Sequence, residues 1–265
     1  MKRGSLSLAM VALAGVLAGG IGVYAVGSSH RSPQVPTTHG EWVKYTNAKG
    51  DSIRAYVAYP ERKDKAPSVI VIHEIFGLTD WEPTVVDKLA GQGYVAIVPD
   101  LLSSRFGVSP ADADSGRKLT ALLMPDDVTA DLDATYRYVN SLPSVKKDDT
   151  GTIGFCWGGG QSFRYATTNP KLKAAVVCYG PTPDSTAIPR IKAKVLGLYG
   201  EGDARINSTL PDAERWTKAA KVSYRYDIYP GTGHGFLKPG RKGSDTPAVD
   251  DAWKKILGFY GETLK

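Results

Sequence analysis

The segment around Cys156 constrains this chain more than any other feature of its sequence. Residues 154–158 read GFCWG, with the short apolar stretch 152–155 leading into them and a potential helix over 161–168 following. A glycine two positions before and two after a nucleophile predicts a sharp turn from strand to helix, with the central residue in a strained backbone conformation. We therefore expect Cys156 at a helix N-terminus, where N–H groups and the helix dipole favour a thiolate. The alternative is a buried, unreactive cysteine in a glycine-rich turn.

Two later loops carry residues that could assist such a nucleophile. The apolar stretch 193–199 predicts a buried strand that ends in a loop with Asp203, and the stretch 224–229 alternates like a strand before the glycine-flanked His234. Either residue alone is weak evidence, because Asp often caps a helix and His often lies in a solvated loop. Both follow successive strands, however, in the order nucleophile, acid, histidine. We therefore predict a triad in which His234 is the base.

The other three histidines are poorer candidates for the base. His30 and His39 belong to a polar segment rich in Pro, Ser and Thr, which offers no scaffold to position them. His73 follows the apolar stretch 69–72 and precedes Cys156, which is the wrong order, although its side chain could still line the site.

The chain resembles the dienelactone hydrolase (carboxymethylenebutenolidase) family of α/β-hydrolases from Trp42 to its C-terminus. The resemblance rests on five motifs in family order: HEIFG at 73–77, VPDL at 98–101, GFCWGG at 154–159, Gly-Asp at 202–203 and GHGF at 233–236. It implies an α/β-hydrolase fold and an enzyme that hydrolyses carboxylic esters or lactones.

The resemblance also implies roles for four side chains. Cys156 would be the nucleophile, His234 the base, Asp203 its orienting acid, and Glu74 a carboxylate that takes or shares the thiol proton. Glu74 has an independent rationale, because a carboxylate at the end of an apolar strand is costly unless it bonds a partner. That partner could be the thiol or a nearby Arg or Lys.

The reaction expected of such a site proceeds through a thioester. In α/β-hydrolases the loop after the strand that precedes Glu74 supplies one oxyanion donor, so the backbone N–H groups of Ile75 and Trp157 are the expected oxyanion hole. Cys156 would attack an ester or lactone carbonyl, and water activated by the histidine would release the acid. Amides are poorer substrates, because a thiolate leaves the tetrahedral intermediate more easily than an amine does.

The substrate contacts of this chain depart from the family pattern. Members specialised for dienelactone bind its carboxylate through an arginine after the histidine motif and through an arginine and a tyrosine after the third strand. Here Lys238 follows the histidine motif, and Ala113 and Arg117 stand at the other two positions. Lys238 keeps the charge but not the planar fork of arginine. We expect contacts from Lys238, with Arg105 or Arg117 as a replacement clamp, and a broader ester specificity.

Aromatic residues are frequent in the motif loops. Phe76, Trp81 and Trp157 are expected to form an apolar rim suited to a planar or alkyl ester, and the alternative is that they close their loops against the core. Phe236 is expected to close its loop against the core.

Alternating strand-like and helical stretches predict one α/β domain. The strands are expected at 52–59, 69–73, 95–98, 152–155, 174–179, 194–199 and 224–229, and the helices near 85–92, 128–142, 161–168, 211–220 and 249–264. This alternation predicts a mostly parallel sheet with helices on both faces.

The N-terminus predicts export. Two basic residues precede the apolar run 6–25, so residues 1–25 are expected to be a signal peptide that directs the protein to the periplasm or the medium. The alternative is an uncleaved membrane anchor through residues 6–25. Residues 26–41 are expected to be a flexible linker and 42–265 the α/β-hydrolase domain.

Composition excludes several other functions. The net charge is +6 and the basic residues are scattered, so nucleic-acid binding is not expected. Zinc-finger spacings, phosphate loops and dinucleotide fingerprints are missing from the sequence, so we expect neither a metal nor a cofactor. We expect a monomer that acts on a small molecule. Cys178 is expected to be a buried thiol, although an exported protein could pair it with Cys156.

Two hypotheses follow from the sequence. The first is an exported cysteine hydrolase of esters or lactones. The second is a catalytically silent α/β-hydrolase-fold protein that binds or scavenges a ligand.

Overall fold

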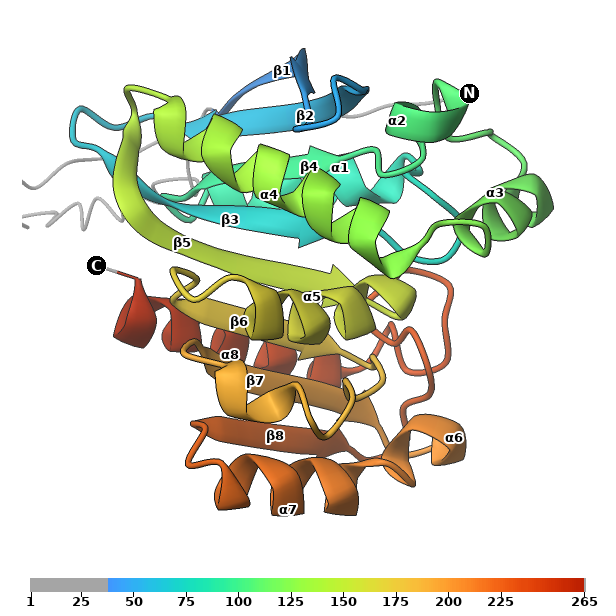
Figure 1. The fold of residues 1–265 in the computed structure, drawn as a ribbon. Helices are drawn as coiled ribbons and strands as arrows, with labels where there is room; N and C mark the ends of the chain where they lie inside the picture. Colours follow the sequence, from blue (N-terminus) through green and yellow to red (C-terminus); the bar gives the residue numbers. More distant parts are fainter. Residues whose placement is uncertain (1–37, 265) are drawn as a thin grey trace, which may run out of the picture. The chain divides into compact units, whose positions relative to one another are not determined.

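One mixed sheet of eight strands forms the centre of the computed structural model, which describes residues 38–264 (Figure 1). The strands are β1 (Thr38–Thr46), β2 (Ser52–Pro60), β3 (Ala66–Ile72), β4 (Val95–Pro99), β5 (Val145–Phe155), β6 (Ala174–Cys178), β7 (Lys194–Gly200) and β8 (Tyr224–Tyr229). Their order across the sheet is β1-β2-β4-β3-β5-β6-β7-β8. The pairs β1–β2 and β2–β4 are antiparallel, and all later pairs are parallel.

Helices cover both faces of this sheet. In Figure 1, α4 (Pro125–Ser141), α5 (Trp157–Thr168) and α7 (Leu210–Ala219) lie in front of the sheet, and α1 (Trp81–Ala90) and α8 (Pro247–Thr263) lie behind it. Shorter elements occupy the connections, namely α2 (Ser103–Phe106), α3 (Ala113–Thr120), α6 (Ala204–Asn207) and the 3-10 turn η1 (Ile188–Arg190).

The covering helices create two apolar cores, one on each face. Leu89 of α1 and Ile256 of α8 belong to one core, and Leu132 of α4 and Phe163 of α5 belong to the other. Because β4 and β6 are buried along their whole length, their sequences are continuous apolar runs, as expected for parallel strands covered on both faces. The predicted fold class is therefore confirmed.

The sequence missed one strand and three short helices. β1 was not predicted, because most of its side chains are exposed and its apolar signal is weak. Its first residues pair with the end of β2, with Thr38 opposite Pro60 and Glu41 opposite Val57. Residues 38–41, which the sequence assigns to a flexible linker, are thus part of the sheet. The helices α2, α3 and α6 are too short to show clear periodicity.

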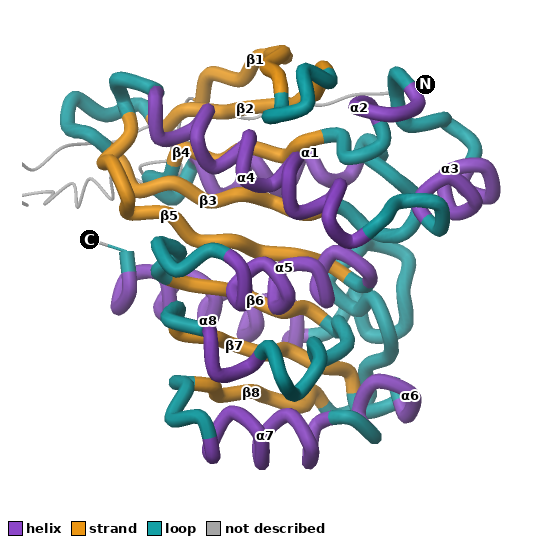
Figure 2. The backbone as a smooth tube through the Cα atoms, viewed as in Figure 1, coloured by secondary structure: helices purple, strands orange, loops and turns teal. Residues whose placement is uncertain are grey.

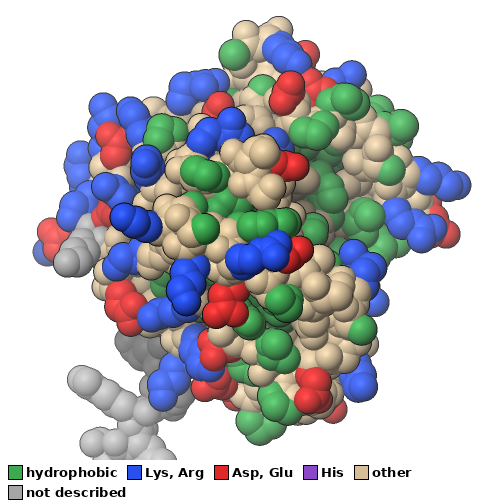
Figure 3. Space-filling model, turned by 60° about the horizontal axis from the view of Figure 1, so that its bottom comes forward, with side chains coloured by type: hydrophobic (Ala, Val, Ile, Leu, Met, Phe, Trp, Pro, Cys, Tyr) green, Lys and Arg blue, Asp and Glu red, His purple; other side chains and the backbone are tan. Residues whose placement is uncertain are grey.

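The predicted signal peptide, the alternative anchor and most of the predicted linker lie outside the described residues. Within residues 38–264, no helix combines the length and the apolar character needed to cross a membrane. Basic and acidic side chains are interspersed over much of the face shown in Figure 3, in keeping with the scattered charges of the sequence.

Long loops gather at the carboxyl ends of the parallel strands (Figure 2). The segments that follow β3, β5, β7 and β8 carry Glu74, Cys156, Asp203 and His234, respectively. Because these strands are parallel, the four residues are delivered to the same edge of the sheet.

Candidate active site

The turn between β5 and α5 has the geometry that the glycine pattern predicts. Cys156 has φ +55° and ψ −117°, a conformation that non-glycine residues rarely adopt. A Cβ on Gly154 would lie 1.9 Å from the carbonyl oxygen of Gly158, and a Cβ on Gly158 would lie 2.3 Å from that of His73. Larger residues at either position would therefore force the turn open. Cys156 itself is a half-buried free thiol at the N-terminus of α5.

The structure brings His234 and Asp203 to this thiol. His234 Nδ1 forms a hydrogen bond with Asp203 Oδ2, which leaves the other ring nitrogen for Cys156, the other group that raises the pKa of His234. Asp203 is nearly buried and also caps α6, since its Oδ1 accepts from the N–H of Ile206 at 3.4 Å. The same carboxylate therefore caps a short helix and orients the histidine.

These partners change the protonation of His234. Burial by itself would lower the pKa of His234. The interactions with Cys156 and Asp203 together outweigh that effect and raise the pKa to about 9. The imidazole is thus largely protonated at neutral pH. A protonated imidazole beside Cys156 favours a thiolate.

Glu74 lies in an ion pair rather than against the thiol. Its Oε2 accepts from Lys238 Nζ at 2.8 Å, and the side chains of Glu74 and Lys238 are only 3% and 18% exposed. Lys238 Nζ also lies 5.0 Å from the centre of the Trp81 ring and 5.7 Å from that of Phe76. Of the two partners considered for Glu74, the structure therefore pairs it with the cation.

Trp81 and Phe76 differ in how they are held. Trp81 begins α1 and packs edge-on against Phe155 of β5, with ring centres 4.7 Å apart. Phe76 is half-buried, and its backbone touches α3 closely, since a Cβ on Gly116 would lie 2.0 Å from the Phe76 carbonyl oxygen. Phe236 is fully buried, in agreement with the prediction.

His73 supports the loop that carries Glu74. Its Nε2 accepts from the backbone N–H of Leu101 at 3.3 Å, so the proton lies on Nδ1, which donates to the carbonyl oxygen of Glu74 at 2.7 Å. The ring stacks on Trp157, with centres 5.5 Å apart. The histidine excluded as a base therefore bonds the peptide carbonyl before Ile75 and packs on the side chain of Trp157, the two residues of the expected oxyanion hole.

Hydrogen bonds through Ser109 also hold the loop that follows β3 and carries Glu74. The buried carboxylate of Asp100 accepts from the Ser109 hydroxyl at 2.6 Å, and the Ser109 oxygen accepts from the N–H of Leu78 at 2.8 Å.

Within residues 38–264, the N–H of Ile75 donates to no acceptor. Trp157 is the first residue of α5, where N–H groups have no acceptor within the helix. Both N–H groups are thus available to hold an oxyanion.

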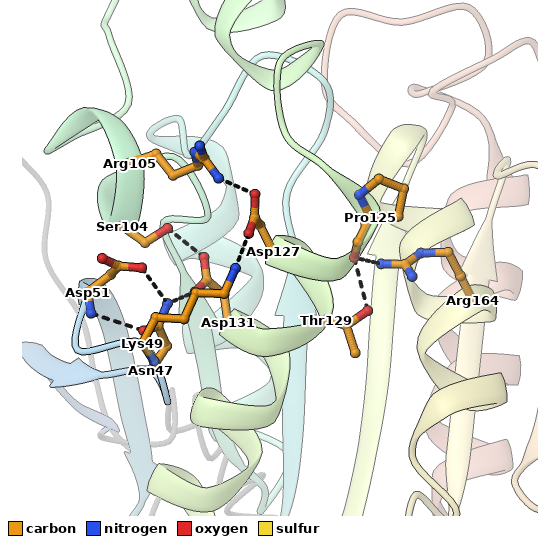
Figure 4. Close-up of polar contacts among 10 residues, drawn as sticks. All are labelled: Asn47, Lys49, Asp51, Ser104, Arg105, Pro125, Asp127, Thr129, Asp131 and Arg164. Atoms are coloured by element: carbon orange, nitrogen blue, oxygen red, sulfur yellow. Dashed lines mark hydrogen bonds and ion pairs between the residues drawn. The ribbon is translucent and has the colours of Figure 1, made fainter.

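The two arginines suggested as a replacement clamp lie elsewhere. Arg105, on α2, pairs with Asp127 at the start of α4, and Lys49 from the β1–β2 turn binds the same carboxylate (Figure 4). Arg117 pairs with Asp114 one turn earlier on α3, at 2.9 Å. The structure does not bring either guanidinium to Glu74 or Lys238.

Sequence reasoning missed Tyr179, which directly follows β6. Its ring lies edge-on to that of His234, with centres 5.1 Å apart. Its place could have been found from the order of the strands, since Tyr179 directly follows β6, which is the neighbour of β5, and Cys156 directly follows β5. The preceding Cys178 is fully buried, as predicted, and burial raises the pKa of its thiol.

The described residues offer no site for a metal ion. Across 38–264, three or more His, Cys, Asp or Glu side chains never converge in an arrangement that could hold one. At this edge of the sheet, the structure places a thiol, an imidazole and a carboxylate beside the N–H groups of Ile75 and Trp157.

Comparisons with known proteins agree with this geometry. The model of the dienelactone hydrolase family matches residues 53–264. A protein of Synechocystis sp. with the provisional name carboxymethylenebutenolidase is 32% identical over 231 residues, which cover 80% of this chain and 93% of the relative. A protein of Salmonella typhimurium with the same provisional name is 35% identical over 233 residues, covering 81% and 84%.

A solved structure shows the same fold. The crystal structure of a protein from Klebsiella pneumoniae, provisionally named a dienelactone hydrolase, matches with a TM-score of 0.78 at 30% identity and covers 85% of this chain and 99% of that one. The chain has the α/β-hydrolase fold and belongs to the dienelactone hydrolase family.

Proposed function

We propose that this protein hydrolyses carboxylic esters or lactones, with Cys156 as the nucleophile and a thioester as the intermediate. The observation that carries the proposal is the convergence of Cys156, His234 and Asp203 at the carboxyl edge of the sheet, where His234 is bonded to Asp203 and Cys156 helps to raise the pKa of His234. Family membership supports the reaction class, because the relatives carry names of lactone hydrolases.

In the first half of the reaction, the thiolate of Cys156 attacks the carbonyl carbon of the substrate. The N–H groups of Ile75 and Trp157 hold the negative charge that develops on the carbonyl oxygen. Protonated His234 then gives its proton to the leaving oxygen, the carbon–oxygen bond breaks, and the acyl group remains on sulfur. A pKa of His234 near 9 keeps that proton available at neutral pH.

In the second half, His234 acts as a base. It takes a proton from water, the resulting hydroxide attacks the thioester carbon, and the carbon–sulfur bond breaks to release the acid and the Cys156 thiolate. Asp203 holds Nδ1 of the ring throughout, which keeps the other nitrogen toward the thiol and the water.

The Glu74–Lys238 pair supports a preference for substrates that carry a negative charge. Lys238 lies against Trp81 and Phe76, so a planar anionic substrate would find a cation and aromatic surface together. Such an anion would compete with Glu74 for Lys238. Where Cys156 still carries its proton, a released Glu74 carboxylate would take that proton, as the family resemblance suggests, so that both routes lead to the thiolate.

The first experiment compares hydrolysis of dienelactone and a short aryl ester by the full chain under reducing conditions. Cys156→Ala is the matched control for both substrates. Turnover of dienelactone that this substitution abolishes would support an anionic lactone substrate, and turnover of the aryl ester alone would support a broader esterase. Activity that survives in Cys156→Ala would contradict the cysteine mechanism, and inactivity of the wild type on both would favour a ligand-binding protein.

We also propose that the protein is exported through its N-terminal segment and acts as a monomer. The apolar run 6–25 after two basic residues supports the first part. Mass spectrometry of the protein recovered from the periplasm and the medium tests cleavage near residue 25. An intact chain found only in the membrane fraction would favour the anchor, and light scattering would reveal any dimer.

A further inference from the structure

Two basic side chains lie against the glycines that flank His234. A Cβ on Gly235 would lie 3.3 Å from Cγ of Arg241 and 3.7 Å from its Nε. A Cβ on Gly233 would lie 3.3 Å from Cβ of Lys242 and 3.5 Å from its Cδ. Because neither glycine has a side chain, both basic residues can approach the loop of the proposed base closely.

Backbone hydrogen bonds hold the two basic residues in this position. The N–H of Gly233 donates to the carbonyl oxygen of Lys242 at 3.0 Å. The N–H of Arg241 donates to the carbonyl oxygen of Lys238 at 3.3 Å, and the N–H of Ser244 donates to that of Arg241 at 2.9 Å. Arg241 and Lys242 therefore belong to a turn that is bonded to the histidine loop.

Arg241 also adjoins an aromatic ring that Lys238 shares. Its guanidinium carbon lies 5.9 Å from the centre of the Phe76 ring, and Lys238 Nζ lies 5.7 Å from the same centre. Arg241 is exposed to solvent, whereas the Lys238 side chain is only 18% exposed and is bound to Glu74. Phe76 thus adjoins one outer cation and one cation of the buried pair.

The positive charges of Arg241 and Lys242 have no carboxylate partner. Within the described part of the chain, residues 38–264, neither side chain forms an ion pair. The carboxylates of the preceding loop are engaged elsewhere, because Asp203 binds His234 and Glu201 accepts from a backbone N–H at 3.0 Å. Both cations are therefore available to an anion that arrives from solvent.

The outer cations are easier for such an anion to reach than Lys238. An anion that binds Lys238 directly must take it from Glu74, and a buried charge that loses its partner is costly. An anion that binds Arg241 or Lys242 breaks no ion pair. Charges of one sign beside a site also raise the local concentration of ligands of the opposite sign.

We propose that Arg241 and Lys242 are specificity-determining residues that form an outer binding site for the negatively charged group of the substrate, before that group engages Lys238. This inference rests on the proposed function, in which the preferred substrate is an anionic ester or lactone. The planar fork of Arg241 matches a carboxylate, and Lys242 adds a second positive charge. Neither residue acts on the carbonyl carbon that reacts.

The test compares alkylation of Cys156 by iodoacetate, which is an anion, with alkylation by iodoacetamide, which is neutral and similar in size. In both reactions the thiolate attacks the methylene carbon, a carbon–sulfur bond forms and iodide leaves. The ratio of the two rate constants cancels any change in the thiolate itself, because both reagents react with the same group. Cys156→Ala gives the background labelling of the full chain.

The variant carries Arg241→Gln together with Lys242→Gln. At low ionic strength, its ratio of iodoacetate to iodoacetamide rate constants should be about threefold or more below that of the wild type. The difference should disappear in about 1 M salt, which screens exposed charges. Arg241→Lys with Lys242→Arg keeps both charges and should keep most of the wild-type ratio.

Arg215→Gln with Lys218→Gln is the matched control, because it removes the same charge from the exposed face of α7. An equal fall of the ratio in this control overturns the proposal, since net charge alone would then explain the effect. An unchanged ratio in the variant at positions 241 and 242 also overturns it. If Lys238→Met lowers the ratio and that variant does not, the anion meets Lys238 directly and no outer site exists.

Steady-state kinetics adds a second readout. Arg241→Gln with Lys242→Gln should raise KM several-fold for an anionic ester, leave kcat nearly unchanged, and alter neither constant for a neutral aryl ester. A fall in kcat at unchanged KM contradicts the proposal. Alkylation needs no hydrolysis, so a ratio that falls in a protein without esterase activity would support the outer site and reject the proposed function. An unchanged ratio in an active esterase would reject the outer site alone.

Discussion

Two clusters of charged side chains in this protein both pair a carboxylate with basic residues, but they differ in burial. At the carboxyl edge of the sheet, Lys238 binds Glu74, and the two side chains are 18% and 3% exposed. At the other cluster, Lys49 and Arg105 share Asp127, and both cations are about half exposed (Figure 4). An exposed ion pair gains little because water competes with it, whereas a buried one is strongly coupled to its surroundings. Burial, more than residue type, distinguishes the first cluster from the second.

The sharpest test of this contrast removes the nucleophile. Cys156→Ala should reduce ester hydrolysis on the order of 10⁵-fold, because the histidine and the acid cannot act without it. Steady-state kinetics on the substrate that the wild type accepts measures the loss. The melting temperature should change little, since the thiol is half-buried and forms no disulfide. Residual activity above one per cent would contradict the proposed mechanism.

The next test compares one carboxylate from each cluster. Asp203→Asn should lower kcat by about 10³–10⁴-fold, because the amide no longer orients and stabilises protonated His234. Asp127→Asn is the matched control and should leave kcat unchanged, since among residues 38–264 the Asp127 carboxylate pairs with Lys49 and Arg105, away from the nucleophile. Similar losses in the two variants would show that the clusters are not functionally distinct.

A third comparison concerns the cations and is measured by urea unfolding. Lys238→Met leaves the Glu74 carboxylate buried without its partner, so the free energy of unfolding should fall by about 2–3 kcal/mol. Lys49→Met should have no measurable effect, because its side chain is exposed. If both variants unfold at the same urea concentration, the burial of the Glu74 pair does not matter for stability.

The smallest expected effect is on the pH dependence of stability. The pKa of His234 in the folded protein is about 9, above its unfolded value near 6.5. Its protonation therefore stabilises the fold fully below about pH 6.5, and this contribution is lost as the pH rises through 9. The difference in unfolding free energy between wild type and His234→Gln should shrink from pH 6 to pH 10. A constant difference would mean that His234 does not titrate in this range.

The sequence by itself determined the parts of this protein that depend on short-range geometry. The glycines around Cys156 are required because a Cβ at Gly154 or Gly158 would collide with backbone atoms a few residues or one strand away. The continuous apolar runs of β4 and β6 likewise predict strands buried on both faces. Strand order then delivers Asp203 and His234 to the same edge, as predicted.

Only the tertiary structure decided which charged groups meet. Glu74 and Lys238 lie 164 positions apart in the chain, and their contact depends on how the loops after β3 and β8 pack together. Arg105 was a candidate for the substrate site, but α2 places it beside the N-terminus of α4, where Asp127 binds it. β1 escaped prediction because most of its side chains are exposed, so its pairing with β2 leaves little apolar signal in the sequence. The contact of Tyr179 with His234 joins distant segments, and local sequence patterns report only near neighbours.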